Sequence, residues 1–259
     1  MHNLLDDYAH SNALRDVSSS LKLFLAFSSI LICIFSTSPV VPLFIAFSMG
    51  FIIVAMAKIP LRIYAKLLLV PLSFALMSTL AIIFVQGETP LFTFTIFDFS
   101  LSIKSEGIEL ALLLLSRTLG GMSALFFIAL TTPMIEIFSI LKSFGLPELL
   151  MELSMLVYRY IFLLLDEATM IHNAQTMRMG NSGLRSSLKS FSMLSSVLFL
   201  RAWEQGERLM IAMDSRCYNG RLDVMDDKVP PSKMVTAATL SYLTVLIIIA
   251  VFTKDMSLL

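Results

Sequence analysis

The chain has 259 residues, of which 57% are hydrophobic and 15% are charged, and its mean hydropathy is +0.83. Soluble domains average about 45–50% apolar and about 25% charged residues, so the excess predicts surface that faces lipid rather than a larger core. The net charge is zero and the pI is near 6.8, which excludes the basic surface typical of nucleic-acid-binding proteins. The two cysteines lie far apart in the chain and form neither a disulfide framework nor a metal-binding set.

Apolar runs predict transmembrane helices at residues 21–35, 40–57, 67–85, 108–130 and 235–252. About 20 such residues span the hydrocarbon core as a helix, and backbone groups in lipid must be satisfied within the segment. The bias of positive charge toward the inside places Lys58, Arg62 and Lys66, and with them the N-terminus, in the cytoplasm. The loop 86–106 is then expected outside. The predicted fold class is all-α: a polytopic integral membrane protein with about five transmembrane helices.

Residues 131–230 differ in kind, because they hold more than half of the charged residues of the chain. They predict a cytoplasmic insertion of long helices between the fourth and fifth spans. Pro133 and Pro147 suit the first turn of a helix, and "GNSG" separates a helix at about 148–179 from a helix at about 184–217. The predicted organisation is a cytoplasmic lead at 1–20, four transmembrane helices at 21–130, the long-helix region at 131–230 and the final transmembrane helix at 231–259.

Both long helices carry apolar residues at alternating spacings of three and four, a pattern that predicts packing along a shared seam. The members are Leu149, Leu153, Leu156, Tyr160, Leu163, Met170, Ala174 and Met177, with Glu167 as the polar exception, and Phe199, Trp203, Gly206, Met210, Met213 and Cys217. Charged residues at 201, 204, 207 and 208 are spaced to pair along the surface of the second helix. Residues 155–165 are apolar enough to enter the membrane, but Arg159 within them favours an interfacial helix.

Each long helix is expected to end in an arginine. "AQTMRMGNSG" (174–183) and "AMDSRCYNGR" (212–221) share an alanine, three further residues, an arginine and a nearby glycine. One interpretation is that Arg178 and Arg216 lie in the last helical turn, where a cation complements the helix dipole, with Gly180 and Gly220 as stops. The other is that the arginines bind a partner, because the planar guanidinium favours interfaces.

The repetition favours the partner surface. Its candidate residues are Ala174, Gln175, Met177, Arg178 and Met179 at the first helix end, and Ala212, Met213, Ser215, Arg216 and Cys217 at the second.

Arg117 lies inside the fourth apolar run and has two open interpretations. An intramembrane arginine is costly and usually faces protein, which predicts contact with a neighbouring span or with another subunit that it couples to. Alternatively, its side chain extends to the membrane interface. Gly120 and Gly121 nearby favour close helix packing.

The segments "LVYRYIFLLLDEATMIHNAQTMRMG" and "LFLRAWEQGERLMIAMDSRCYNG" resemble the transmembrane T component of energy-coupling factor (ECF) transporters, and most closely its cobalt/nickel type, the CbiQ family. That family carries an Ala-Arg-Gly signature at the end of each of two coupling helices. Here the matching residues are Met177-Arg178-Met179 and Ser215-Arg216-Cys217, so the arginines match and their neighbours do not.

The resemblance implies a multi-pass protein of the prokaryotic inner membrane that couples two ATP-binding cassette ATPase subunits to a substrate-binding integral membrane subunit. It implies no enzymatic activity, no directly bound cofactor or metal, and no nucleic-acid partner. ATP is used by the partner subunits, in agreement with the lack of a G-x-x-x-x-G-K-[ST] motif. The cargo implied is cobalt or nickel, in support of cobalamin biosynthesis.

The alternatives are a T component for another micronutrient such as a vitamin, an intramembrane enzyme, and a stand-alone channel or carrier. The apolar runs hold no paired acids and no histidine, which disfavours an enzyme, and they show no internal repeat, which disfavours a stand-alone carrier.

Overall fold

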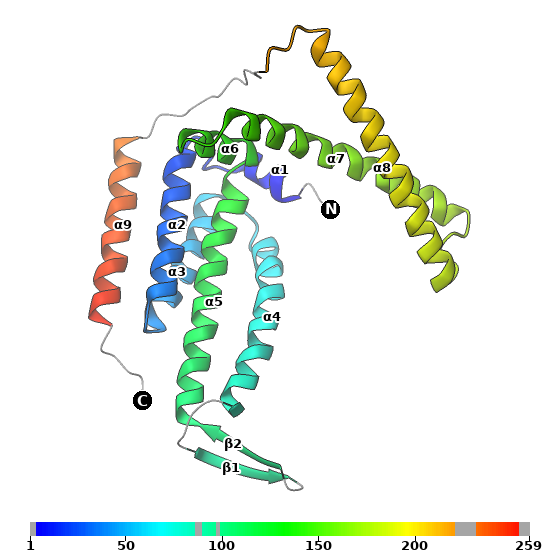
Figure 1. Ribbon diagram of the computed structural model, residues 1–259. Coiled ribbons are helices and arrows are strands. Elements are labelled where there is room, and N and C mark those ends of the chain that lie inside the picture. Colours follow the sequence, from blue (N-terminus) through cyan, green and yellow to red (C-terminus); the bar gives the residue numbers. More distant parts are fainter. Residues whose placement is uncertain (1–3, 86–89, 97–98, 221–231, 254–259) are drawn as a thin grey trace. The chain divides into compact units, whose positions relative to one another are not determined.

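The computed structural model describes residues 4–85, 90–96, 99–220 and 232–253 (Figure 1). The chain divides into two compact units, Met1–Ile137 with Asp227–Leu259, and Phe138–Asp226. Helix α6 (Met134–Ser143) carries the chain from the first unit into the second. The predicted boundary at residues 230–231 lies outside the described residues.

The first unit contains the apolar segments. Its elements are α1 (Leu4–Ser11), α2 (Ser19–Phe35), α3 (Val40–Phe51), the π-helix η1 (Ile52–Met56), α4 (Leu61–Val85), β1 (Pro90–Ile96), β2 (Phe99–Lys104), α5 (Ser105–Thr131) and α9 (Lys233–Phe252). Among the described residues, the helices long and apolar enough to cross a membrane are Leu61–Phe84, Gly107–Thr131 and Lys233–Phe252, and the shorter apolar helices are Ser19–Phe35 and Val40–Met56. These segments coincide with the predicted runs, so the expected helical membrane fold is confirmed.

The stretch between α4 and α5 is more regular than expected. It was predicted as a loop, yet β1 and β2 pair as an antiparallel hairpin, with Ile96 opposite Phe99. The alternation of apolar and polar residues in "FTFTI" and "SLSI" is typical of strands, so this hairpin does have a local signal in the sequence.

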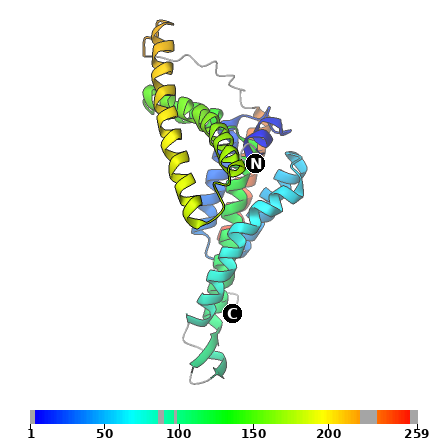
Figure 2. The ribbon, with the colours of Figure 1, turned by 90° about the vertical axis from the view of Figure 1, so that its right-hand side faces the viewer.

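Helix α5 lies at the centre of the first unit, where it contacts α1, α2, α3 and α4 (Figures 1 and 2). On the segment formed by α3 and η1, Val41, Ile45, Met49 and Ile53 are completely buried. They lie four residues apart and so share one helix face, which packs inward while other apolar side chains face outward.

The carboxyl end of α5 is buried, and side chains from the amino-terminal segment satisfy it. Asn12 Nδ2 and Lys22 Nζ donate to the carbonyl oxygen of Thr131 at 3.3 and 3.2 Å. Lys22 is only 3% exposed, and its positive charge complements the helix C-terminus. Ser19 also donates to Glu136 in the first turn of α6. Because a buried helix end needs such partners, this cluster fixes the corner where the chain leaves α5.

The second unit is built on two long helices, α7 (Glu148–Met177) and α8 (Leu184–Asp214), joined by a short turn. Pro133 and Pro147 stand directly before the first residue of α6 and of α7, so the prolines precede the first turn instead of lying in it. Contacts between Gln175 and Ser190 and between Glu167 and Arg201 show that the two helices run antiparallel.

The predicted apolar seam between these helices is wrong. Leu149, Leu153, Phe199, Trp203 and Met210 are all between 48% and 68% exposed, and α8 buries no residue fully. A periodic apolar pattern identifies a helix face, but it does not specify what covers that face. Polar contacts join the helices instead, such as the ion pair between Arg201 and Glu167 at 3.6 Å. Of the charged residues predicted to pair along the surface of α8, the structure pairs Arg208 with Glu204, at 3.8 Å.

Candidate functional site

The end of α7 has a left-handed turn built around Arg178. The backbone of Arg178 closes the helix, and Met179 follows with a φ of 62°. The amide of Met179 donates to the carbonyl of Thr176 at 3.1 Å, and the amide of Gly180 donates to that of Gln175 at 2.8 Å. These two bonds define a Schellman motif, which satisfies the last carbonyls of a helix.

The end of α8 repeats this backbone around Arg216. Cys217 has a φ of 56°, and its amide donates to the carbonyl of Asp214 at 3.0 Å. The amide of Tyr218 donates to the carbonyl of Met213 at 3.1 Å. Each arginine therefore occupies the same position in the same motif, directly before the left-handed residue.

Two details of the predicted helix ends need correction. Arg178 and Arg216 follow the last helical residue rather than lying in the last turn. The residues that end the helices in a left-handed conformation are Met179 and Cys217, whereas Gly180 and Gly220 were expected to end them. Left-handed geometry costs a residue with a side chain about 1–2 kcal/mol and glycine almost nothing, so this is the position where the glycine of an Ala-Arg-Gly signature fits without strain. Both turns here adopt the same conformation without that glycine.

Most of the candidate docking residues are open to a partner. Arg178 and Arg216 are exposed, as are Ala174, Met177, Met179, Ala212, Ser215 and Cys217, whereas Gln175 and Met213 are half-buried. Neither arginine forms an ion pair with another residue that the structure describes. Each turn thus presents an exposed guanidinium, without an ion pair to the described part of the chain, on a surface of small and flexible side chains.

The turn between α7 and α8 is stabilised by Gln175 and by two serines that the sequence did not single out. Gln175 Nε2 donates to the carbonyl of Ser190 at 2.9 Å, and the hydroxyls of Ser186 and Ser190 donate to the carbonyl of Gly180 at 2.7 and 2.9 Å. A Cβ at Gly180 would lie 2.8 Å from the backbone carbonyl oxygen of Gln175, which cannot rotate aside as the Ser190 hydroxyl can, so glycine is needed for this close approach. Gln175 therefore supports the turn, and no local pattern in the sequence identified its partners.

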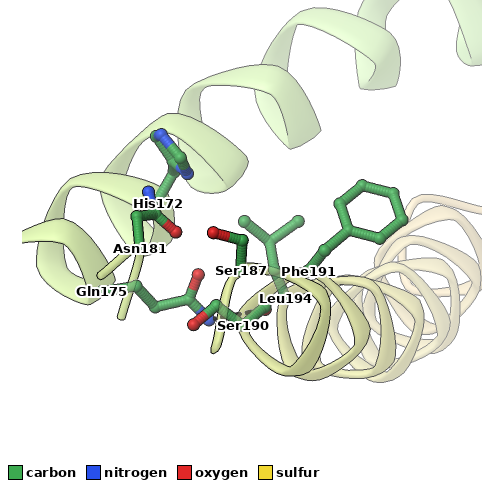
Figure 3. A pocket seen from close by; sticks show the side chains of 7 residues that line it. All are labelled: His172, Gln175, Asn181, Ser187, Ser190, Phe191 and Leu194. Carbon is green, nitrogen blue, oxygen red and sulfur yellow. Dashed lines mark hydrogen bonds between the residues drawn. The ribbon is translucent and has the colours of Figure 1, made fainter. Parts of the chain in front are cut away.

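A hollow of about 400 Å³ opens beside this turn (Figure 3). It is lined by His172, Gln175, Asn181, Ser187, Ser190, Phe191 and Leu194. Its polar side chains come from the end of α7, from Asn181 in the turn and from the start of α8, so the first arginine turn adjoins a concave surface.

Arg117 contacts the end of a neighbouring helix. Its Nη2 and Nε donate to the carbonyl of Ser36, the C-cap of α2, at 2.6 and 3.2 Å. Cys33 Sγ donates to the carbonyl of Arg117 at 3.5 Å, and the arginine is half-buried. The side chain thus satisfies a buried helix end, and a role in coupling to another subunit stays a prediction.

We expect Arg117→Leu to destabilise the first unit by about 1–3 kcal/mol, because the carbonyl of Ser36 would lose both donors while buried. Arg117→Lys keeps one donor group and should recover part of the loss. Thermal unfolding of the full chain in detergent checks this order. A leucine variant that melts at or above the wild-type temperature would instead mark Arg117 as a residue kept for a partner.

Among the described residues, no group of three or more His, Cys, Asp or Glu side chains could hold a metal ion, and Cys33 and Cys217 are both free thiols.

The five apolar helical segments and the two exposed arginine turns define a multi-pass helical membrane protein that presents two cationic helix ends. The chain belongs to the CbiQ family of cobalt transport proteins, whose pattern it matches over residues 10–225. It is therefore a membrane component of a transport family rather than a member of an enzyme family.

Relatives support this assignment. The chain is 41% identical to the uncharacterized protein MJ1089 of Methanocaldococcus jannaschii, over 99% of this chain and 96% of that protein. It is 45% identical to a putative fused cobalt transport protein CbiMQ of Methanocorpusculum labreanum, over 87% of this chain but only 38% of that longer protein. It is 30% identical to the cobalt transport protein CbiQ of Salmonella typhimurium, over 63% of this chain and 74% of that protein.

Proposed function

We propose that this chain is the coupling component of an ATP-driven ECF importer of cobalt or nickel ions. In this function it binds two ATP-binding cassette subunits through its two arginine turns and a substrate-binding membrane subunit through its first unit. The observation that carries the proposal is the repeated motif, in which Arg178 and Arg216 occupy equivalent, exposed positions at the ends of two long helices.

The mechanism follows from that geometry. A helix end with an exposed arginine suits a groove on a partner, because the guanidinium makes bidentate contacts that fix its direction. When ATP binding closes two such partners, α7 and α8 are displaced with them, as packed helices shift during domain closure. The chain passes from these helices through α6 into α5 at the corner that Lys22 and Glu136 stabilise. The displacement thereby reaches the membrane helices and the cargo-binding partner.

In this function the chain binds no cofactor itself, and ATP is bound and hydrolysed by the partner subunits. The relatives named as cobalt transport proteins, one of them a fusion, support a cobalt cargo and a system of several components.

The test is reconstitution. The chain is co-expressed with candidate ATP-binding subunits and a candidate substrate-binding membrane subunit from the same organism, purified, and placed in liposomes. We expect the ATP-binding subunits to co-purify in a two-to-one ratio and Co²⁺ uptake to require ATP hydrolysis. Co²⁺ uptake by this chain alone, without nucleotide, would contradict the proposal.

A further inference from the structure

Both arginine turns are hydrogen-bonded to the opposite long helix, but through different groups. At the first turn, the carbonyl of Gly180 accepts from Ser186 and Ser190, which are close neighbours in sequence. At the second turn, the phenol of Tyr218 donates to Glu152 Oε2 at 2.8 Å. Glu152 lies 66 residues earlier, in the first part of α7, so this bond joins the end of α8 to the start of α7.

Glu152 is an unusual residue for its surroundings. It is 8% exposed, and together with Met151 it forms the buried part of α7. Burying a carboxylate is costly unless hydrogen bonds compensate, so this acid is a specific acceptor rather than a surface charge. The bond to Glu152 also raises the pKa of the Tyr218 phenol, since it favours the protonated, donating form.

Tyr218 also closes the turn that contains Arg216. Its amide bonds to the carbonyl of Met213, and its phenol bonds to Glu152, so one residue fixes the turn to both helices. Cys217, directly before Tyr218, has a left-handed backbone conformation that a residue with a side chain does not prefer. Without the phenol bond, only this strained turn would set the direction of Arg216.

We propose that Glu152 and Tyr218 are positioning residues for Arg216, which hold the second arginine turn in the orientation that a partner binds. The proposal rests on the docking function of Arg216. It also makes the two helix ends unequal, because the second depends on a long-range hydrogen bond and the first on a local turn.

The first measurement needs no partner. Cys217 is exposed and Cys33 is buried, so a nitroxide label on the native Cys217 thiol reports on the mobility of the second turn. We expect Tyr218→Phe and Glu152→Leu to increase the label's mobility, and Glu152→Gln, which keeps an acceptor oxygen, to increase it less. Tyr160→Phe on α7 is the matched control and should leave the spectrum unchanged.

The second measurement uses the unlabelled full chain and a purified ATP-binding subunit. In an Arg178→Glu background, where only the second turn can bind, we expect Tyr218→Phe to weaken binding about tenfold. In an Arg216→Glu background the same substitution should change nothing, a specificity that a general loss of stability would not produce.

The outcomes separate the two claims. If the wild-type chain does not bind the ATP-binding subunit, the docking function is wrong and the positioning role is overturned with it. If wild-type Tyr218 and the Tyr218→Phe variant bind equally in the Arg178→Glu background, only the positioning role is overturned. Unchanged mobility of the Cys217 label in Tyr218→Phe would likewise overturn it.

Discussion

Gly120→Ala is expected to destabilise the first unit by about 2 kcal/mol, because a Cβ there would lie 2.6 Å from the carbonyl oxygen of Pro42. It would also lie 3.0 Å from Cys33 Sγ. A backbone atom cannot move aside as a flexible side chain can, so α5 would have to withdraw from α3. Small residues allow this kind of close contact between membrane helices. Arg117 is one turn earlier on α5, so its bond to Ser36 should weaken as well.

The neighbouring glycine provides the matched control. A Cβ at Gly121 meets nothing within 4 Å, so Gly121→Ala should be neutral or stabilise α5 by up to about 1 kcal/mol. Unfolding of both variants in detergent should therefore show midpoints about 4–8 °C apart or more. Equal midpoints would mean that α5 and α3 do not approach each other as closely as the structure shows.

The fold was largely predictable because its main signals are local. Apolar runs near 20 residues identified the spans, and Pro133 and Pro147 identified helix starts. The capping of α5 by Asn12 and Lys22 could not be predicted, since donors and carbonyl are more than a hundred residues apart in the chain. The apolar faces of α7 and α8 were predicted to meet, but periodicity does not identify a helix face's neighbour.

The candidate site was predictable in its residues but not in its geometry. Repetition in the sequence singled out Arg178 and Arg216, yet nothing about Met179 or Cys217 indicates a left-handed backbone, which both residue types disfavour. The sequence likewise gives no indication of the Tyr218–Glu152 bond, because the two residues are 66 positions apart and belong to no common motif. Local chemistry thus specified which side chains matter, and tertiary contacts specified how they are held.

Arg178→Glu combined with Arg216→Glu is expected to lower affinity for the ATP-binding subunits at least about 100-fold while leaving the chain inserted and folded. Exposed arginines at the centre of an interface typically contribute about 2–4 kcal/mol each, and charge reversal adds repulsion from whatever acidic group accepts them. Both side chains are exposed and make no ion pair among the described residues, so their replacement should cost little stability. Co-purification in detergent and a titration with the purified subunit measure the loss.

The single variants decide whether the two turns act separately. Because the turns lie on different helix ends, each single variant should retain one bound subunit, and the two losses should add. Arg185→Glu with Arg208→Glu makes the same change in charge at two exposed arginines of α8 and removes only an exposed ion pair, which contributes less than about 1 kcal/mol. If this control loses the subunits as the Arg178 and Arg216 pair does, the interaction depends on net charge and the turns are not the docking sites. If the control keeps both subunits while the Arg178→Glu and Arg216→Glu single variants each lose one, each turn binds its own ATP-binding subunit.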